Sequence, residues 1–208
     1  MYSRISDQAV PIRKIGELIM GWSVTENFAI IDNTAIIDGP VKIWHHSVIR
    51  SGVHLSPGCI IGHCVVVERD THIGENTTIQ SQCHITAEAR IGKGCFFGPG
   101  VIMTNEKNIA NLGRTDAKIE RAIVGNGVRI GAGCLLLPGI QIGDNAFIAA
   151  GSLISKNVPA GEFWAGRPAR KVRDVPVEEF LFVSEEGMTW REEEPETQLN
   201  DDMEPCAL

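Results

Sequence analysis

Aromatic residues, long apolar runs and a basic surplus are all scarce in this 208-residue sequence. Aromatic side chains make up 6% of the residues although hydrophobic residues together make up 43%, which favours thin aliphatic layers over a core of large rings. No run of about 18 apolar residues occurs, so we predict no membrane span. The N-terminus lacks the charged start, apolar stretch and cleavage site of a signal peptide, so we expect a cytoplasmic protein.

Paired cysteines are also missing. The chain has six cysteines but no CxxC pair, which argues against a thiolate zinc site. Four of them share one small-residue position of the repeat described below, and we interpret these as core residues in a reducing compartment rather than a disulfide framework. They are Cys59, Cys83, Cys95 and Cys134.

The net charge of −7 comes from the C-terminal end of the chain. Nine Asp and Glu and one Arg follow Ser184, a net charge of −8, which leaves +1 for residues 1–184. A nearly neutral body predicts no nucleic-acid-binding surface. The acidic end has the composition of a poorly ordered tail.

The sequence does contain a long hexapeptide repeat. Twelve hexads run from Ile31 to Ile102 and six more from Val124 to Pro159. Each begins with a large apolar residue, and the fourth position is Gly, Asn or Asp in twelve of the eighteen. These are residues that tolerate positive φ angles. Each hexad is therefore predicted to be a short strand followed by a corner.

One strand and one corner cannot bury an apolar face alone, so the hexads must stack as a solenoid. Three hexads per turn give a triangular coil of 18 residues and about six coils. A generic β-sandwich would instead show strands at a spacing of about 8–12 residues with irregular turns. We therefore predict an all-β parallel solenoid.

The repeat also predicts the domain organisation. Residues 1–30 form an irregular lead-in whose last part, Thr25 to Ile30, is interpreted as a degenerate first hexad. Residues 31–173 form the repeat domain, with an inserted loop at 104–122. Residues 174–208 are predicted to hold a short amphipathic helix at 176–183 and the acidic tail.

Exceptions to the repeat gather on one side of the predicted solenoid. Hexads starting at 43, 61, 79 and 97 stack there, and three successive ones carry His46, Cys64 and Gln82 in place of Gly, Asn or Asp. Local departures from a structural rule tend to mark functional sites. The loop follows the last of these rungs, and the hexad that begins at Met103 is not expected to continue. A long loop in so regular a fold indicates function.

Histidines accompany these exceptions. His45 and His63 occupy the same position one coil apart, so they should lie about one strand spacing from each other. His84 lies one rung below the loop. Such a group suits acid/base chemistry, whereas His54 and His72 are predicted to stack on another side.

The hexads, the loop and two closing segments resemble the hexapeptide-repeat acyltransferases. The closing segments are Lys156-Asn157-Val158-Pro159-Ala160 and Gly166-Arg167-Pro168-Ala169-Arg170. The resemblance covers about residues 25–173 and implies a left-handed parallel β-helix and acetyl-CoA as co-substrate.

Within that family, four further segments look closest to the N-acetyltransferases of UDP- or dTDP-linked amino sugars. They are Ile43-Trp44-His45, Ile79-Gln80, Phe97-Gly98-Pro99 and Met103-Thr104-Asn105. The resemblance implies homotrimers with active sites between subunits, acetyl-CoA in the groove between helices and a nucleotide-sugar amine beneath the loop. This chain departs from the pattern at His63-Cys64 and Ser81-Gln82, where such relatives often carry Gln-Asn and Asn-Asn.

These arguments lead to a set of predicted site residues. His63 is predicted to be the base or proton shuttle and Asn105, by resemblance, the residue that orients the substrate. The predicted substrate-binding residues are His45, Gln82, His84 and Thr104. The predicted residues for acetyl-CoA are Gly131, Ala149, Lys156, Arg167, Arg170 and Lys171, the basic ones meeting its phosphates. No metal is expected.

Three alternatives stay open. An O-acetyltransferase acting on a sugar or xenobiotic hydroxyl is poorly separated from the N-acetyl hypothesis by sequence. A γ-class carbonic anhydrase would hold zinc with three histidines, but its H-x4-H spacing does not occur among the six histidines here. A non-catalytic repeat scaffold would suit the acidic tail but does not need the loop or the Gly166 to Arg170 segment.

Overall fold

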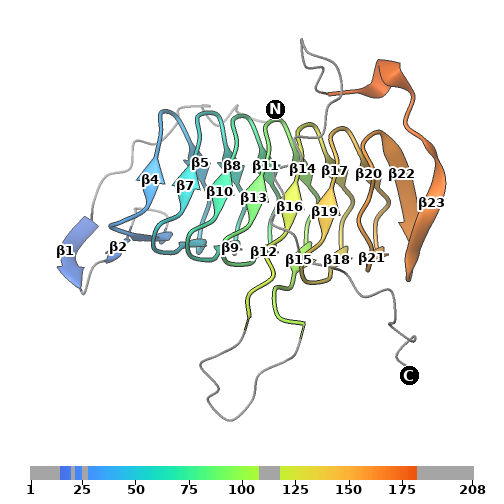
Figure 1. Cartoon of the computed structure of the whole chain (residues 1–208). Coiled ribbons are helices and arrows are strands. Elements are labelled where there is room, and N and C mark those ends of the chain that lie inside the picture. Colours follow the sequence, from blue (N-terminus) through green and yellow to red (C-terminus); the bar gives the residue numbers. More distant parts are fainter. Residues whose placement is uncertain (1–14, 20–21, 25–27, 108–117, 182–208) are drawn as a thin grey trace, which may run out of the picture.

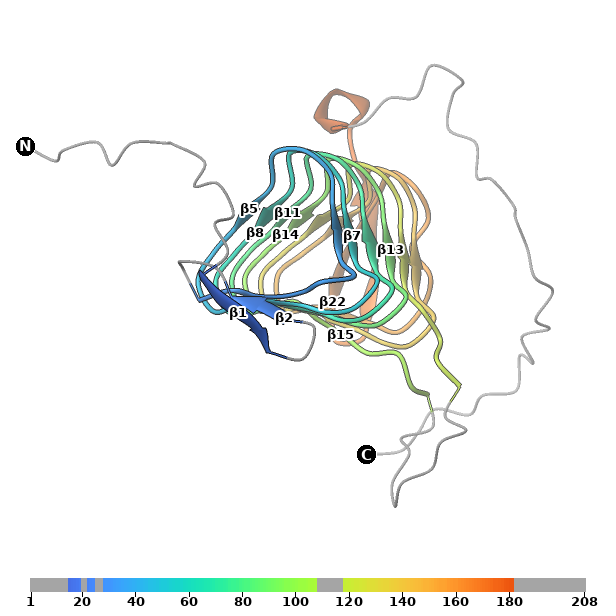
Figure 2. The same cartoon turned by 90° about the vertical axis from the view of Figure 1, so that its left-hand side faces the viewer.

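The computed structural model describes residues 15–19, 22–24, 28–107 and 118–181. These residues form a triangular solenoid of very short parallel strands, closed at each end by an antiparallel strand pair (Figures 1 and 2). Seen from its N-terminal end, the chain turns counterclockwise as it recedes, so the coil is left-handed (Figure 2). The predicted all-β solenoid is confirmed.

Three sheets, named A, B and C in the order in which the chain meets them, form the sides of the triangle. Sheet A contains β1 (Ile15–Ile19), β2 (Trp22–Val24), β3 (Ile30–Asp32), β6 (Val48–Ile49), β9 (Val66–Val67), β12 (His84–Ile85), β15 (Ile102–Met103), β18 (Leu135–Leu136) and β21 (Leu153–Ile154). Sheet B contains β4 (Ile36–Ile37), β7 (His54–Leu55), β10 (His72–Ile73), β13 (Arg90–Ile91), β16 (Ile123–Val124) and β19 (Gln141–Ile142). Sheet C contains β5 (Lys42–Ile43), β8 (Ile60–Ile61), β11 (Thr78–Ile79), β14 (Phe96–Phe97), β17 (Arg129–Ile130), β20 (Phe147–Ile148), β22 (Glu162–Gly166) and β23 (Ala169–Asp174).

The strict repeat produces this stack because each two-residue strand directs one side chain in and one out. The leading residue of the hexad points inward, as with Ile49, Leu55 and Ile61, each 0% exposed. The residue before it points outward. Parallel pairing with an 18-residue offset, such as Ile73 with Ile91, puts identical hexad positions above one another. Sheet B has six strands, one for each complete coil, and β21 begins a seventh turn that ends at β22.

The cysteines at the shared hexad position are buried, as predicted. The Cys83 thiol donates a hydrogen bond to the Gly98 carbonyl at 3.2 Å. Burial raises the pKa of Cys83 and of Cys95 to about 11. These side chains fill the corners of the core as protonated thiols.

The insertion replaces one corner and leaves the strands on both sides intact. As expected, Met103 begins a hexad that the loop interrupts: Met103 is 1% exposed and pairs with Leu136 of the next coil, and no strand follows it before β16 among the described residues. Val124 then resumes on sheet B, where it pairs with Ile91. A bridge between Glu106 and Ile119 closes the neck of the loop. The chain therefore leaves the solenoid and returns to it at the same corner.

Both ends of the solenoid are finished differently from its middle. Strands β1 and β2 continue sheet A as antiparallel neighbours, and the β22–β23 pair covers the C-terminal coil. In place of the predicted helix, the described residues contain a single 3-10 turn, η1 (Val177–Glu179). Within the described ranges, no helix has the length and apolar character needed to cross a membrane. The acidic tail lies outside the described residues.

Close approach of successive backbones makes a test of the stacking possible. A Cβ on Gly74 would lie 2.6 Å from the Gly92 carbonyl carbon and 2.8 Å from the Lys93 nitrogen. Backbone atoms cannot give way as a flexible side chain can, so Gly74→Ala should lower the free energy of unfolding by about 2–3 kcal/mol. Gly94→Ala is the control, because its Cβ would meet nothing within 4 Å. Its positive φ alone should cost about 1 kcal/mol. Equal decreases in the free energy of unfolding for the two variants, measured by urea denaturation, would contradict this explanation.

Candidate active site

Each coil turns three corners, and the corner between sheet C and sheet A differs in charge from the other two. This C–A corner comprises residues 44–47, 62–65, 80–83, 98–101, 131–134 and 149–152, none of which is Asp or Glu. The corner between sheets A and B carries Glu68 and Asp70, and that between B and C carries Glu75. An anionic ligand would meet no carboxylate repulsion along the C–A corner.

Two predicted site residues meet at this corner. The rings of His45 and His63 stack with centroids 5.3 Å apart and an interplanar angle of 13°. The backbone amide of His63 donates to the Ser81 hydroxyl at 3.1 Å, and its carbonyl accepts from the Gln82 amide at 2.8 Å. Both imidazoles are exposed. The corner backbone is thus held by neighbouring coils while its imidazoles remain accessible to a ligand.

The residues that broke the hexad rule adopt the conformation that the rule demands. His46, Cys64 and Gln82 have φ angles of 61°, 54° and 64°. At the other corners, non-glycine residues with positive φ are Asp, Asn or Glu. A side chain such as that of Cys64 or Gln82 is held there at a cost of about 1 kcal/mol. Strain of this kind, retained on consecutive rungs, is typical of functional positions.

The loop leaves from a different corner. Thr104 and Asn105 follow β15 at the A–B corner, on the far edge of sheet A from His63 (Figure 2). The Thr104 hydroxyl donates to the Leu136 carbonyl at 2.9 Å, and the Asn105 carbonyl accepts from the Glu120 amide at 2.8 Å. Within one chain, the fold therefore does not bring Asn105 to His63.

His84 projects from sheet A between these two corners. Its Nε2 lies 3.8 Å from Glu68 Oε1, and Glu68 also accepts a 3.0 Å hydrogen bond from Arg50. The His84 side chain therefore lies beside the Glu68 carboxylate at the A–B corner and not beside the His45–His63 pair.

Three of the residues predicted to bind acetyl-CoA continue the C–A corner toward the C-terminal end. Gly131 and Ala149 occupy equivalent positions in successive coils. Arg167 follows β22, and its Nη1 donates to the Gly151 carbonyl at 3.2 Å. The corner thus forms one straight strip, the C–A strip, from His45 and His63 through Gly131 and Ala149 to Arg167.

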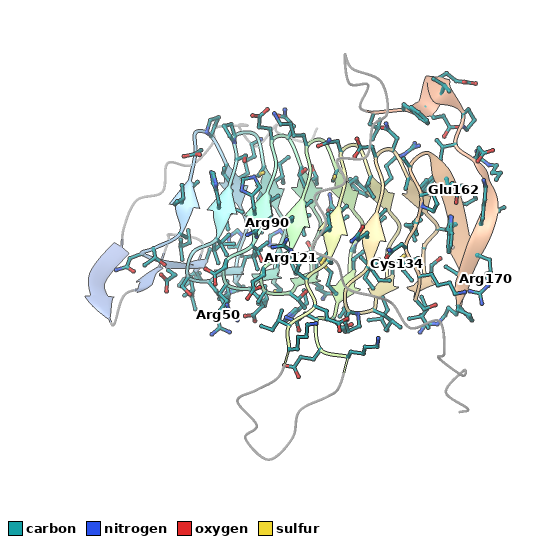
Figure 3. The ribbon with its side chains drawn as sticks, viewed as in Figure 1. Arg50, Arg90, Arg121, Cys134, Glu162 and Arg170 are labelled. Carbon is teal, nitrogen blue, oxygen red and sulfur yellow. The ribbon has the colours of Figure 1, made fainter. Side chains whose placement is uncertain are left out.

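The other basic residues predicted to bind acetyl-CoA lie off this strip. Lys156 follows β21 at the A–B corner. Arg170 is exposed on β23, at the C-terminal end of the solenoid (Figure 3). Lys171 forms ion pairs of 2.7 Å with both Glu162 and Asp174. Hydrogen bonds to Asp174 and then Glu162 raise its pKa, so this cation already has protein partners.

A second group of titratable residues lies on the outer face of sheet B. His54 Nε2 is 2.6 Å from Asp38 Oδ2, and the His54 and His72 rings meet edge to face at 4.6 Å. They line an open cavity of about 580 Å³ together with Arg90. Among the residues that the structure describes, no group of three or more His, Cys, Asp or Glu is placed to hold a metal ion.

This group predicts a pH-dependent stability. Burial, followed by the charges of His54 and Arg90, lowers the pKa of His72 below its ordinary 6.5, while Asp38 acts in the opposite direction. The unfolded chain then binds the proton more readily than the folded one, so the free energy of unfolding should fall as the pH drops below about 6.5. In urea denaturation, the free energy of unfolding of the His72→Asn variant should fall less between about pH 8 and pH 5 than that of the parent. Parallel pH profiles for the parent and the variant would contradict the assignment.

Two exposed aromatic residues on the same strip were not among the predicted site residues. Trp44 lies one position before His45, and its ring centroid is 5.3 Å from that of His63. Phe28 has a φ of 60° and stacks on His46. Reading every position of the corner, rather than its fourth alone, would have identified Trp44. Phe28 is the fourth residue of the degenerate first hexad, Thr25 to Ile30, so applying the same rule to that hexad would have identified it.

Comparison with known proteins supports the repeat and the fold. The family described as bacterial transferase hexapeptide (six repeats) matches residues 70–105 and 121–156. The bifunctional protein GlmU of Streptococcus uberis is 34% identical over 156 residues, which are 74% of this chain and 31% of that protein. GlmU of Clostridium botulinum is 30% identical over 149 residues, 70% of this chain and 30% of that protein. The chain thus spans about a third of the length of these curated relatives.

Among solved structures, the polySia specific acetyltransferase NeuO superposes with a TM-score of 0.57 at 18% identity, covering 76% of this chain and 79% of NeuO. This likeness concerns the fold. The family relationship comes from the two matched segments on either side of the loop: the chain carries the repeats of the bacterial transferase hexapeptide family.

Proposed function

We propose that this protein is an acetyl-CoA-dependent N-acetyltransferase that acylates the amino group of a nucleotide-linked amino sugar. The observation that carries the proposal is the C–A strip. It aligns a pair of stacked, accessible imidazoles, His45 and His63, with the small residues Gly131 and Ala149 and with the guanidinium of Arg167. No acidic side chain interrupts it.

The C-terminal half of the strip suits the acyl donor. Gly131 and Ala149 would leave room for an extended pantetheine chain beside the backbone, with the thioester directed toward Gln82 and His63. Arg167 and Arg170 would bind the phosphates, because guanidinium groups bind phosphate oxygens in a bidentate manner. Lys171 would act indirectly, since Glu162 and Asp174 already neutralise it.

The N-terminal half of the strip suits the acceptor. The amine nitrogen attacks the thioester carbon, the carbon–sulfur bond breaks, and the amine loses a proton. His63 would take that proton and return it to the departing thiolate. A backbone N–H beside the strip would stabilise the charge that develops on the thioester oxygen. Gln82 and His45 would form the walls that hold the sugar near His63.

A site that contains both Asn105 and His63 would need a second copy of the chain, because the two residues lie at different corners. The outward face of sheet A supports such a contact, since all but one of its outward residues in the coils are apolar. These are Ile30, Val48, Val66, Ile102, Leu135 and Leu153, interrupted by His84. We propose a homotrimer that buries this face and brings the Asn105 corner of one copy to the His63 corner of another.

Steady-state kinetics of His63 variants test the chemistry. With acetyl-CoA and a panel of UDP- and dTDP-linked amino sugars, His63→Ala should lower kcat by about a hundredfold or more, since a positioned base supplies that much. His54→Ala, on the opposite side of the solenoid, should keep the parent rate. Turnover of His63→Ala within about threefold of the parent would remove its role as base. Thiol release with hydroxyl analogues alone would favour O-acetylation instead.

Mixing two inactive variants tests whether the site is shared. His63→Ala and Asn105→Ala each disable every site in a uniform oligomer. If the two residues of one site come from different copies, random exchange of subunits should restore about a quarter of the parent activity. Mixtures that stay as inactive as the separate variants would show that the site is not shared in this way.

A further inference from the structure

Five exposed rings cluster at the N-terminal end of the C–A strip, two of them assigned above to acetyl transfer and three without an assigned role. We call this cluster the ring platform; it consists of Phe28, Trp44, His45, His46 and His63. Phe28 and His46 are nearly parallel, with centroids 5.8 Å apart and an interplanar angle of 14°. His45 and His46 follow at 6.3 Å, and Trp44 and His63 at 5.3 Å. The rings form a continuous aromatic surface.

Neither core packing nor backbone preference explains Phe28. Its side chain is 63% exposed, so it contributes little to the hydrophobic core. Its φ of 60° lies in the region that bulky residues rarely adopt. Glycine occupies this corner position in the fourth, fifth and sixth coils, at Gly100, Gly133 and Gly151, with similar φ angles. A bulky aromatic ring held in that conformation and open to solvent is therefore a candidate for ligand contact.

Trp44 shares this exposure, and the chain leaves space around it. Its side chain is 44% exposed. The equivalent position in the next coil is Gly62, where a Cβ would lie 2.5 Å from the Ser81 nitrogen. No side chain therefore stands above the indole at that position, and the ring can reach the imidazole of His63.

Charge at the platform favours a phosphate-bearing ligand. Residues 44–47, 62–65 and 80–83 of the C–A corner include no carboxylate, and three imidazoles of the platform can donate hydrogen bonds. The exposed Lys42 projects from β5, two residues before Trp44. Exposed aromatic rings beside such groups are the arrangement with which proteins bind nucleotides, because every base has a flat π-face.

We propose that the ring platform binds the base of a nucleoside diphosphate, with Phe28 and His46 as the stacking surface. This inference rests on the proposed function, for which it names the subsite of the acceptor's nucleotide. The diphosphate would then pass over Trp44 and His45, with Lys42 alongside. The sugar would reach His63 and Gln82.

The spacing of the coils fits this placement. Phe28, His46, Cys64 and Gln82 occupy the same corner position in four successive coils. At about 4.8 Å per coil, the strip from Phe28 to Gln82 is about 14 Å long. That length accommodates a base, a ribose and a diphosphate laid out along it before the sugar amine arrives at the acetyl donor.

Phe28→Gly provides a test that does not depend on misfolding, because glycine suits the positive φ and should keep or raise stability. Calorimetric titration of the full chain with UDP, without acetyl-CoA, should show an affinity at least about tenfold lower than that of the parent. Phe28→Tyr should retain parent affinity. Ile36→Ala is the matched control, since Ile36 is an exposed residue of the same coil on sheet B. Unchanged UDP affinity in Phe28→Gly would overturn the proposal.

Ribose 5-phosphate separates stacking from a general loss of the site. It lacks a base, so the Phe28→Gly variant should bind it with the affinity of the parent. The losses of affinity caused by removing the base from the ligand and the ring from the protein should therefore not be additive. Equal loss for both ligands would also overturn the proposal. Transfer to an amino-hexose 1-phosphate measures the proposed function separately. If UDP binding depends on Phe28 but no acceptor is acetylated, the ring platform is supported and the proposed function is refuted. If acceptors are acetylated but UDP binding does not depend on Phe28, the proposed function is supported and the ring platform is refuted.

Discussion

The 18-residue register between coils is the constraint on which the rest of the structure depends. Strands of two residues gain almost nothing alone, so the fold is held by amide-to-carbonyl bonds from each coil to the next and by the inward aliphatic side chains. That spacing brings backbones so close that residues such as Gly74 and Gly131 cannot carry a Cβ without displacing the coil above. Each coil therefore depends on its neighbours, and a single corner can depart from the rule where its backbone hydrogen bonds to those neighbours are kept.

The C–A corner uses that freedom. On four successive coils it carries Phe28, His46, Cys64 and Gln82 at a position where the backbone requires positive φ. Further along, the same position returns to Gly133 and Gly151, beside the small residues proposed to meet the acyl donor. One straight strip thus changes from aromatic and polar to small and open. The change in side-chain size suits the proposed ligands, a bulky acceptor at one end of the strip and a thin pantetheine chain at the other.

The cationic residues near the C-terminal end differ in their hydrogen-bond and ion-pair partners. Lys171 is held by two carboxylates, whereas Arg167 is bonded to a backbone carbonyl of the strip itself. Only the second arrangement leaves a cation whose charge is not already neutralised. The histidines divide in the same way, since His54 faces Asp38 and His84 faces Glu68, while His45 and His63 face each other and Trp44.

The sequence by itself determined the solenoid, the inward face of every strand and the proximity of His45 to His63, because a period of six with a coil of 18 assigns each residue a side and a height. It could not determine the phase after the insertion. Whether Val124 resumed on sheet A or sheet B depended on Met103, which occupies an inward position of sheet A before the loop interrupts its hexad. That one strand moves the loop to the A–B corner and separates Asn105 from His63. Only the tertiary structure decided this, because pairing between coils, and not local pattern, sets the corner at which a chain may leave the stack.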